Sequence, residues 1–345
     1  MKKIKIGIIS PISWRTPPRK YGPWEQVASN IAEGMIRYGH DVTLFATGDS
    51  ATKGKLVSVC PRPVEEDKSL DSEVYKFLHL SKVFEYADSF DIIHNQFDYY
   101  PLVFSPFIKT PMVTTINGFH HQQYKKIYQK FDKQVHYVSI SDSNRAKELS
   151  YAATVYNGID MEEFEFDDKS KRDYLLFIGR ISRDKGTDRA IKIAKSVDIP
   201  LVIAGQVPPE EKEYFSKLVK PQIDGKFIKW IGPVDSLGRK KVFSQAIASL
   251  HMINFDEPFG LTVAEAMASG VPVIAINRGS MPELITNDVD GFLVKNDQEA
   301  IRAIAKIDMI DRVKCRQKVK NNFTIEKMTQ GYLNVYQEVL NNKNI

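Results

Sequence analysis

Short apolar runs alternate with longer segments of helical period along the whole chain. In the first half the runs are found at 4–9 (IKIGII), 42–46, 91–94, 112–116, 136–140 and 153–156. A helix is predicted from about Trp24 to Tyr38, with Pro23 in its first turn and Gly39 after its last. β-Branched runs separated by helices are typical of βαβ units that build a parallel sheet.

The second half repeats this pattern after an acidic stretch at 161–173. Its apolar runs are found at 174–179 (YLLFIG), 201–205 (LVIAG), 227–232, 249–254 and 272–276. A helix is predicted from about Thr187 to Val197, and a closing amphipathic helix from about Ile325 to Leu340. We therefore predict an N-terminal Rossmann-like domain at 1–164, a C-terminal one at 165–324, and a helix at 325–345 that packs back on the N-terminal domain.

The length and composition agree with two soluble domains. The 345 residues exceed what one core normally serves, and 43% hydrophobic and 26% charged residues are ordinary values for globular proteins. No apolar run approaches the roughly 20 residues that span a bilayer, and the chain starts without a cleavable leader, so we expect a cytoplasmic protein.

Charge and cysteine content exclude several classes of protein. The net charge of +5 favours anionic ligands or an anionic membrane surface, but it is too small to indicate nucleic-acid binding. Cys60 and Cys315 lie far apart without a CxxC motif, so we expect buried thiols rather than a disulfide or a zinc site.

The strongest candidate for chemistry is the segment 254–275 (NFDEPFGLTVAEAMASGVPVIA), in which an acidic loop joins a strand to a helix. Ligands bind at the carboxyl ends of parallel strands, and the start of a helix attracts anions. Gly260 permits a close backbone approach. Glu257 in the loop and Glu265 in the helix can accept hydrogen bonds from the hydroxyls of a sugar and of a ribose. The alternative is a capped helix beside a surface acid.

This segment carries a family resemblance that extends over nearly the whole chain. EPFGLTVAE (257–265) resembles the two-glutamate signature of family 4 glycosyltransferases. Further segments that resemble this family are YLLFIGRISRDKG (174–186), ATVYNGID (153–160) and RYGHDVTLFATGDS (37–50).

The resemblance implies a GT-B fold of the α/β class, with two facing Rossmann-like domains, parallel sheets and an interdomain cleft. It implies a retaining hexosyltransferase that uses a UDP-, GDP- or ADP-sugar and a sugar, lipid or small-molecule acceptor. No cofactor and no metal are expected, because fixed cations and a helix dipole stabilise the departing phosphate. Asp288 and Asp290 form an Asp-x-Asp, but NDVDG is rich in turn formers and is expected to be a loop.

The donor-side residues also follow from the resemblance. Arg180 and Lys185 would bind the diphosphate, Glu257 the transferred sugar and Glu265 the ribose. Other positions expected to line the donor site are Gly22, Gly179, Gly205, Val234, Phe259, Gly260, Leu261 and Thr262, the last four through backbone amides. For Arg180 and Lys185 the alternative is a solvated basic loop.

The acceptor side is expected in the first domain, where the loop at 9–25 carries Arg15 and Trp24. Family members usually have two glycines in this loop, whereas this chain has Gly22 followed by Pro23, which lacks an N–H. A purely structural loop is the alternative.

Asn117 stands where the family commonly has a histidine near the reacting sugar. An amide cannot exchange a proton near neutral pH, so His120 or His94 would have to supply proton transfer if the reaction needs it. The family also implies that the departing phosphate accepts the proton. A hydrogen-bonded loop role is the alternative for both histidines.

Two further alternatives concern surfaces and activity. The segment 120–133 predicts a helix with an apolar face and lysines elsewhere, which either lies on an anionic membrane at the inner face or packs on its own sheet. The competing activities are a nucleotide-sugar epimerase and a non-catalytic nucleotide-sugar-binding protein. The sequence does not predict an oligomeric state.

Overall fold

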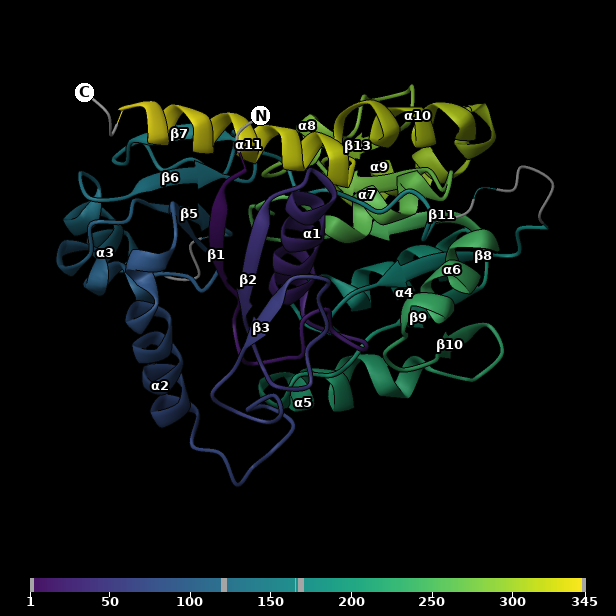
Figure 1. Ribbon diagram of the computed structural model, residues 1–345. Coiled ribbons are helices and arrows are strands. Elements are labelled where there is room, and N and C mark those ends of the chain that lie inside the picture. Colours follow the sequence, from purple (N-terminus) through teal and green to yellow (C-terminus); the bar gives the residue numbers. More distant parts are fainter. Residues whose placement is uncertain (1–2, 119–122, 165, 167–170, 343–345) are drawn as a thin grey trace. The chain divides into compact units, whose positions relative to one another are not determined.

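The computed structural model describes residues 3–118, 123–164, 166 and 171–342 (Figure 1). The chain divides into two compact units, Met1–Gly158 with Ile325–Ile345, and Ile159–Thr324. The first unit ends at Gly158, whereas the sequence pattern placed the boundary at residue 164. The second unit starts earlier because the Ile159 amide donates to the Phe323 carbonyl at 2.8 Å, which ties this residue to the end of the same unit.

The first unit contains, in its described residues, a seven-stranded parallel sheet with the order β3-β2-β1-β4-β5-β6-β7. Its strands are β1 (Lys5–Ile9), β2 (Asp41–Phe45), β3 (Lys55–Val57), β4 (Ile92–Asn95), β5 (Met112–Ile116), β6 (His136–Ser139) and β7 (Tyr151–Thr154). The strand order reverses between β1 and β4, so the loops after these two strands diverge and leave room for a ligand.

The helices of the first unit are α1 (Pro23–Arg37), α2 (Ser72–Glu85), α3 (Tyr124–Phe131) and α11 (Ile325–Asn342). Helix α11 packs closely on α1, because a Cβ at Gly34 would lie only 2.1 Å from Thr329 Oγ1 (Figure 1). The sequence pattern missed α2, whose apolar residues do not form one stripe: Phe77 is 63% exposed whereas Leu80 is buried.

The second unit contains, where it is described, a six-stranded parallel sheet with the order β10-β9-β8-β11-β12-β13. Its strands are β8 (Tyr174–Ile178), β9 (Leu201–Ala204), β10 (Ile228–Trp230), β11 (Ala246–His251), β12 (Val273–Ile276) and β13 (Gly291–Val294). Strand β11 starts earlier than the predicted run 249–254, because the small residues Ala246 and Ala248 are buried in the sheet despite their weak strand preference.

The helices of the second unit are α4 (Thr187–Ser196), α5 (Lys212–Tyr214), α6 (Ser236–Ser244), α7 (Leu261–Ala268), α8 (Met281–Leu284), α9 (Asp297–Ile304) and α10 (Arg312–Asn322). The predicted α/β class with two parallel sheets is confirmed. Cys60 and Cys315 are both buried free thiols, as the sequence indicates.

Candidate active site

The predicted donor residues of the second unit gather at the carboxyl edge of its sheet. Arg180 and Lys185 follow β8, and Glu257 follows β11, the neighbouring strand. The strand order reverses between these two strands, with β9 and β10 on one side and β12 and β13 on the other. Such a switch point is where ligands bind to open α/β sheets.

Glu257 lies at the centre of a small buried cluster. Lys185 Nζ donates to Glu257 Oε2 at 2.6 Å, and His251 Nε2 lies 3.2 Å from the same oxygen. The side chains of Lys185 and Glu257 are only 18% and 12% exposed. The Lys185 ammonium also lies 4.6 Å from the centre of the Phe255 ring. The two residues that the sequence assigned to sugar and diphosphate are therefore in direct contact.

Glu257 is ionised near neutral pH. Burial opposes ionisation of Glu257, but the Lys185 ammonium, followed by His251, outweighs it and lowers the pKa of the carboxyl to about 2. Burial lowers the pKa of His251, although Glu257 opposes this shift. Glu257 is thus an ionised acceptor of hydrogen bonds, a state that suits the binding of sugar hydroxyls.

The loop after β12 holds the Glu257 loop in place. The Ser280 amide donates to the Glu257 carbonyl at 2.9 Å, and Ser280 Oγ donates to the Phe259 carbonyl at 2.7 Å. Gly279 has φ 58°, and a Cβ there would lie 2.4 Å from the Glu257 backbone. The sequence reasoning missed Gly279, Ser280 and His251, because their contacts with Glu257 depend on the pairing of strands.

Helix α7 begins directly after this loop with open backbone donors. Gly260 is its N-cap residue in a left-handed conformation (φ 91°), and no side chain caps the helix. Leu261 and Thr262 are half-buried at the first turn, whereas Phe259 is buried. The first amides of a helix have no intrahelical acceptor, so this terminus can receive an anion.

Glu265 lies one turn further along α7 and is 7% exposed. Arg239 Nη1 donates to Glu265 Oε1 at 3.2 Å, whereas Oε2 is buried and has no hydrogen-bond partner in the described part of the chain. Burial raises the pKa of Glu265 to about 7, with Arg239 opposing and Glu163 assisting the shift. An unused buried acceptor is costly without a ligand, so this oxygen is a candidate partner for a hydroxyl.

The remaining donor residues occupy the ends of neighbouring strands. Arg180 is 37% exposed, and its Nη2 lies 3.4 Å from Asp184 Oδ2. Gly179 and Gly205 follow β8 and β9 in close contact, because a Cβ at Gly205 would lie 1.7 Å from the Gly179 carbonyl oxygen. Val234 is half-buried in the segment after β10. All these positions therefore lie along one edge of the sheet.

In the first unit, the loop after β1 is held by backbone contacts. Arg15 donates from Nε to the Asp49 carbonyl and from Nη1 to the Pro17 carbonyl, each at 2.7 Å. Gly22 is the N-cap residue of α1, and Trp24 is half-buried in the first turn. The Trp14 amide donates to the Glu25 carboxylate at 3.1 Å, a contact that the sequence reasoning missed. Arg15 thus has a visible structural role.

The polar residues at β4 and β5 form a buried network. His94 is fully buried, with Nδ1 2.5 Å from Tyr336 Oη and Nε2 2.8 Å from Thr115 Oγ1. Burial lowers the pKa of His94 to about 3, so it stays neutral. Asn117 is half-buried and donates to Gln96 Oε1 at 3.3 Å. His94 therefore lies in strand β4 and not in a loop, and both of its ring nitrogens have hydrogen-bond partners in the core.

Three further expectations concern His120, the segment 120–133 and the Asp-x-Asp at Asp288 and Asp290. His120 lies outside the described residues. The apolar face of α3 packs into the first unit's own core, where Tyr128 is 1% exposed and Phe131 8%. The Asp290 carboxylate accepts the Thr286 amide at 2.7 Å in the loop before β13, as expected for a turn. Among the described residues, no helix has the length and apolarity needed to cross a membrane.

Solved structures identify the fold. The structure of Alr3699/HepE from Anabaena, determined with UDP and glucose, has a TM-score of 0.76 at 18% identity and covers 97% of this chain and 99% of its own. Sucrose-phosphate synthase from Thermosynechococcus elongatus has a TM-score of 0.79 at 17% identity, over 99% and 100%. The fold is GT-B, that of a large class of glycosyltransferases.

Sequence comparison shows similarity to known glycosyltransferases. Residues 159–323 match the family model described as glycosyl transferases group 1. An uncharacterized glycosyltransferase from Methanocaldococcus jannaschii is 24% identical over 339 residues, which cover 83% of this chain and 84% of that protein. These matches confirm the predicted resemblance to glycosyltransferases of the GT-B fold.

Proposed function

We propose that this chain is a retaining hexosyltransferase that takes its sugar from a nucleotide-diphosphate donor. The observation that carries this proposal is the contact between Lys185 and Glu257 at the switch point of the second sheet, beside the uncapped start of α7. Lys185 suits a phosphate and Glu257 suits sugar hydroxyls.

Each group has a stated role in this proposal. Arg180, Lys185 and the first amides of α7 stabilise the negative charge that develops on the departing diphosphate. Glu257 accepts hydrogen bonds from the sugar, and Glu265 accepts them from the ribose. The bond from the anomeric carbon to the phosphate oxygen breaks, the acceptor oxygen bonds to the same face of that carbon, and the acceptor's proton passes to the diphosphate.

The comparisons support the donor class. Alr3699/HepE has been crystallised with UDP and with UDP-glucose. A D-inositol 3-phosphate glycosyltransferase from Pseudarthrobacter chlorophenolicus is 30% identical over 160 residues, 41% of this chain. We extend the donor class, a nucleotide-diphosphate sugar, to this chain. We also propose that transfer needs no metal, since Arg180, Lys185 and the start of α7 can stabilise the negative charge of the phosphate.

The first experiment identifies the donor. Thermal shifts with UDP, GDP and ADP, followed by their glucose conjugates, should show stabilisation by one nucleotide of about 3 kcal/mol at a hundredfold excess over its Kd. Release of free nucleotide on adding acceptors, from simple sugars to alkyl glycosides, distinguishes a transferase from an epimerase or a binding protein. Stabilisation by none of the nucleotides would contradict the proposal.

The second experiment tests the site. Arg180→Ala should lower turnover on the order of 100-fold, the range seen when one preorganised donor to a transition state is removed. Arg183→Ala is the matched control, because the Arg183 guanidinium lies 5.2 Å from the centre of the Tyr214 ring in the same loop. Equal turnover of the two variants would remove Arg180 from the mechanism. Turnover should also survive EDTA, and its loss would show that a metal is needed.

A further inference from the structure

The second unit contains a cavity at the opposite edge of its sheet from the candidate active site. Arg172 precedes β8, Ile199 precedes β9, and Ile247 lies at the start of β11, so the cavity opens at the amino ends of these strands. Its volume is about 740 Å³, within the range of small-molecule sites, which is about 300–1,000 Å³. None of the predicted donor residues lines it.

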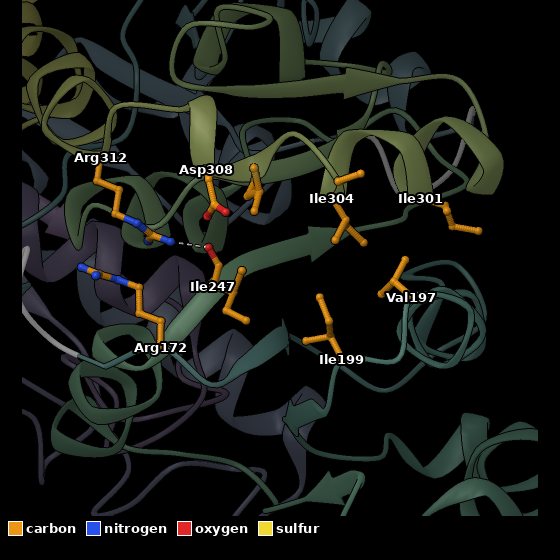
Figure 2. Close-up of a pocket in the computed structure, with 10 residues that line it drawn as sticks. Arg172, Val197, Ile199, Ile247, Ile301, Ile304, Asp308 and Arg312 are labelled. Atoms are coloured by element: carbon orange, nitrogen blue, oxygen red, sulfur yellow. Dashed lines mark hydrogen bonds between the residues drawn. The ribbon is translucent and has the colours of Figure 1, made fainter.

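The cavity has an apolar end and a cationic end. Figure 2 shows Val197, Ile199 and Ile301 at one end, with Ile304 beside them, and Arg172 and Arg312 together at the other. Val197, Ile199 and Ile301 are half-buried and face the open space. An apolar wall with a few convergent polar groups is the usual composition of a ligand pocket.

Arg312 is held in place but keeps donor capacity. Its Nη2 donates to the Ile247 carbonyl at 2.7 Å (Figure 2), and its Nη1 donates to the Gly270 carbonyl at 3.2 Å. Within the described residues, no carboxylate lies within ion-pair distance of its guanidinium, and its Nε has no acceptor. Burial, followed by the charge of Arg172, lowers the pKa of Arg312 to about 10.

The charged groups of the cavity lie at one end. Among the described residues that line it, Arg172 and Arg312 are cationic and Asp308 is a carboxylate. Arg312 is the guanidinium that the preceding contacts leave able to bind an anion in a half-buried setting, where an anion gains more than it would in water. A guanidinium fork is well suited to a carboxylate or a phosphate.

We propose that this cavity binds an amphipathic anion, with its apolar chain against the isoleucines and a carboxylate or phosphate against Arg172 and Arg312. The site is distinct from the donor site and does not depend on the proposed transfer reaction. Neither an inorganic anion nor an uncharged alcohol satisfies both ends of the cavity, so each should bind weakly.

The test is calorimetric titration of the full chain with monomeric decanoate and decyl phosphate, which distinguish the two head groups. At least one should bind saturably with a 1:1 stoichiometry, about tenfold or more tightly than decanol or inorganic phosphate, because charge-assisted hydrogen bonds contribute at least that factor. Hexyl phosphate or hexanoate should bind more than about tenfold more weakly than the ten-carbon ligand, since each buried methylene adds affinity.

Variants of the lining test whether the ligand binds in this cavity. Arg172→Gln and Ile301→Glu should each weaken binding about tenfold, and they avoid Arg312, whose contacts with backbone carbonyls support the fold. The matched controls are Arg302→Gln on the same helix as Ile301, and Met309→Glu, where the side chain is 78% exposed; both should bind as the wild type does.

Three results would overturn the proposal: no saturable binding of either ten-carbon ligand, equal binding by cavity and control variants, or displacement of the ligand by UDP. The last result would place the ligand in the donor site. A chain that binds the amphiphile but no nucleotide would leave the cavity proposal standing and remove the proposed function, so the two failures can be distinguished.

Discussion

The contact between Lys185 and Glu257 makes a quantitative prediction about stability. Folding lowers the pKa of Glu257 from 4.5 to about 2, and at about 1.4 kcal/mol per pH unit this corresponds to about 3 kcal/mol of stabilisation. Both side chains are largely buried, so solvent screens the pair little. Because the folded pKa is the lower one, this stabilisation is complete above pH 4.5 and is lost as the pH falls towards 2.

A double-mutant cycle with Lys185→Met and Glu257→Gln isolates this interaction. Burial and His251 also shift this pKa, so the cycle measures the Lys185 share alone. We expect a coupling free energy of about 1–3 kcal/mol at pH 7 that is smaller at pH 3.5. The exposed pair Lys217 and Glu213, whose side chains are 70% and 76% exposed, is the matched control in the same unit. Its coupling should stay below about 0.5 kcal/mol.

The assay must report on the second unit alone. Trp14 and Trp24 belong to the first unit and Trp230 to the second, and these are the three tryptophans of the chain. In a Trp14→Phe, Trp24→Phe background, urea unfolding followed by Trp230 fluorescence measures the unit that contains the pair. A coupling at pH 7 no larger than that of the control pair, or one that does not change with pH, would refute the reasoning.

Three further predictions concern single positions. Gly279→Ala should displace the Glu257 loop and lower both stability and turnover, because its Cβ would lie 2.4 Å from backbone atoms. Gly225→Ala, also at positive φ but with nothing within 4 Å, should cost only the conformational strain, and equal losses of turnover would contradict the idea. Glu265→Gln should weaken nucleotide binding about tenfold and remove its increase between pH 6 and 8, measured by calorimetry, since the native carboxyl ionises near pH 7. Folding lowers the pKa of His94 from 6.5 to about 3, so the stability of the wild type should fall as the pH drops below 6.5. In urea unfolding at pH 7 and pH 5, His94→Gln should lose the part of this pH dependence that comes from His94. An unchanged pH dependence in the variant would argue against a buried neutral histidine.

Much of the architecture was predictable because it depends on local pattern. Apolar runs with helical segments between them predicted the strands of both parallel sheets, apart from the two edge strands β13 and β3. In β3 only three residues pair, one of them exposed and two half-buried. Glycines and charged residues directly after β8, β9 and β11 predicted one functional edge. This inference needs only the rule that the carboxyl ends of parallel strands meet at the same edge.

The protonation states in the candidate site could not be predicted, because burial and partners from distant strands decide them. Glu257 and Glu265 belong to one short motif, yet the pKa of the first is lowered to about 2 and that of the second is raised to about 7. Lys185 and His251 surround the first, whereas the second is buried, at 7% exposure, with Arg239 on one oxygen only. The sequence shows two carboxylates; the fold makes them chemically different.

The sequence by itself determined the two α/β halves, the motif at the end of β11 and the residue types available to a nucleotide-sugar. Only the tertiary structure decided that Gly279 and Ser280 support Glu257, that His94 is a buried structural residue, and that Arg312 faces a cavity on the other edge of the sheet. The physical reason is the separation along the sequence of the residues that interact. Secondary structure follows from neighbours along the chain, whereas ion pairs, burial and cavities follow from the order in which strands pair.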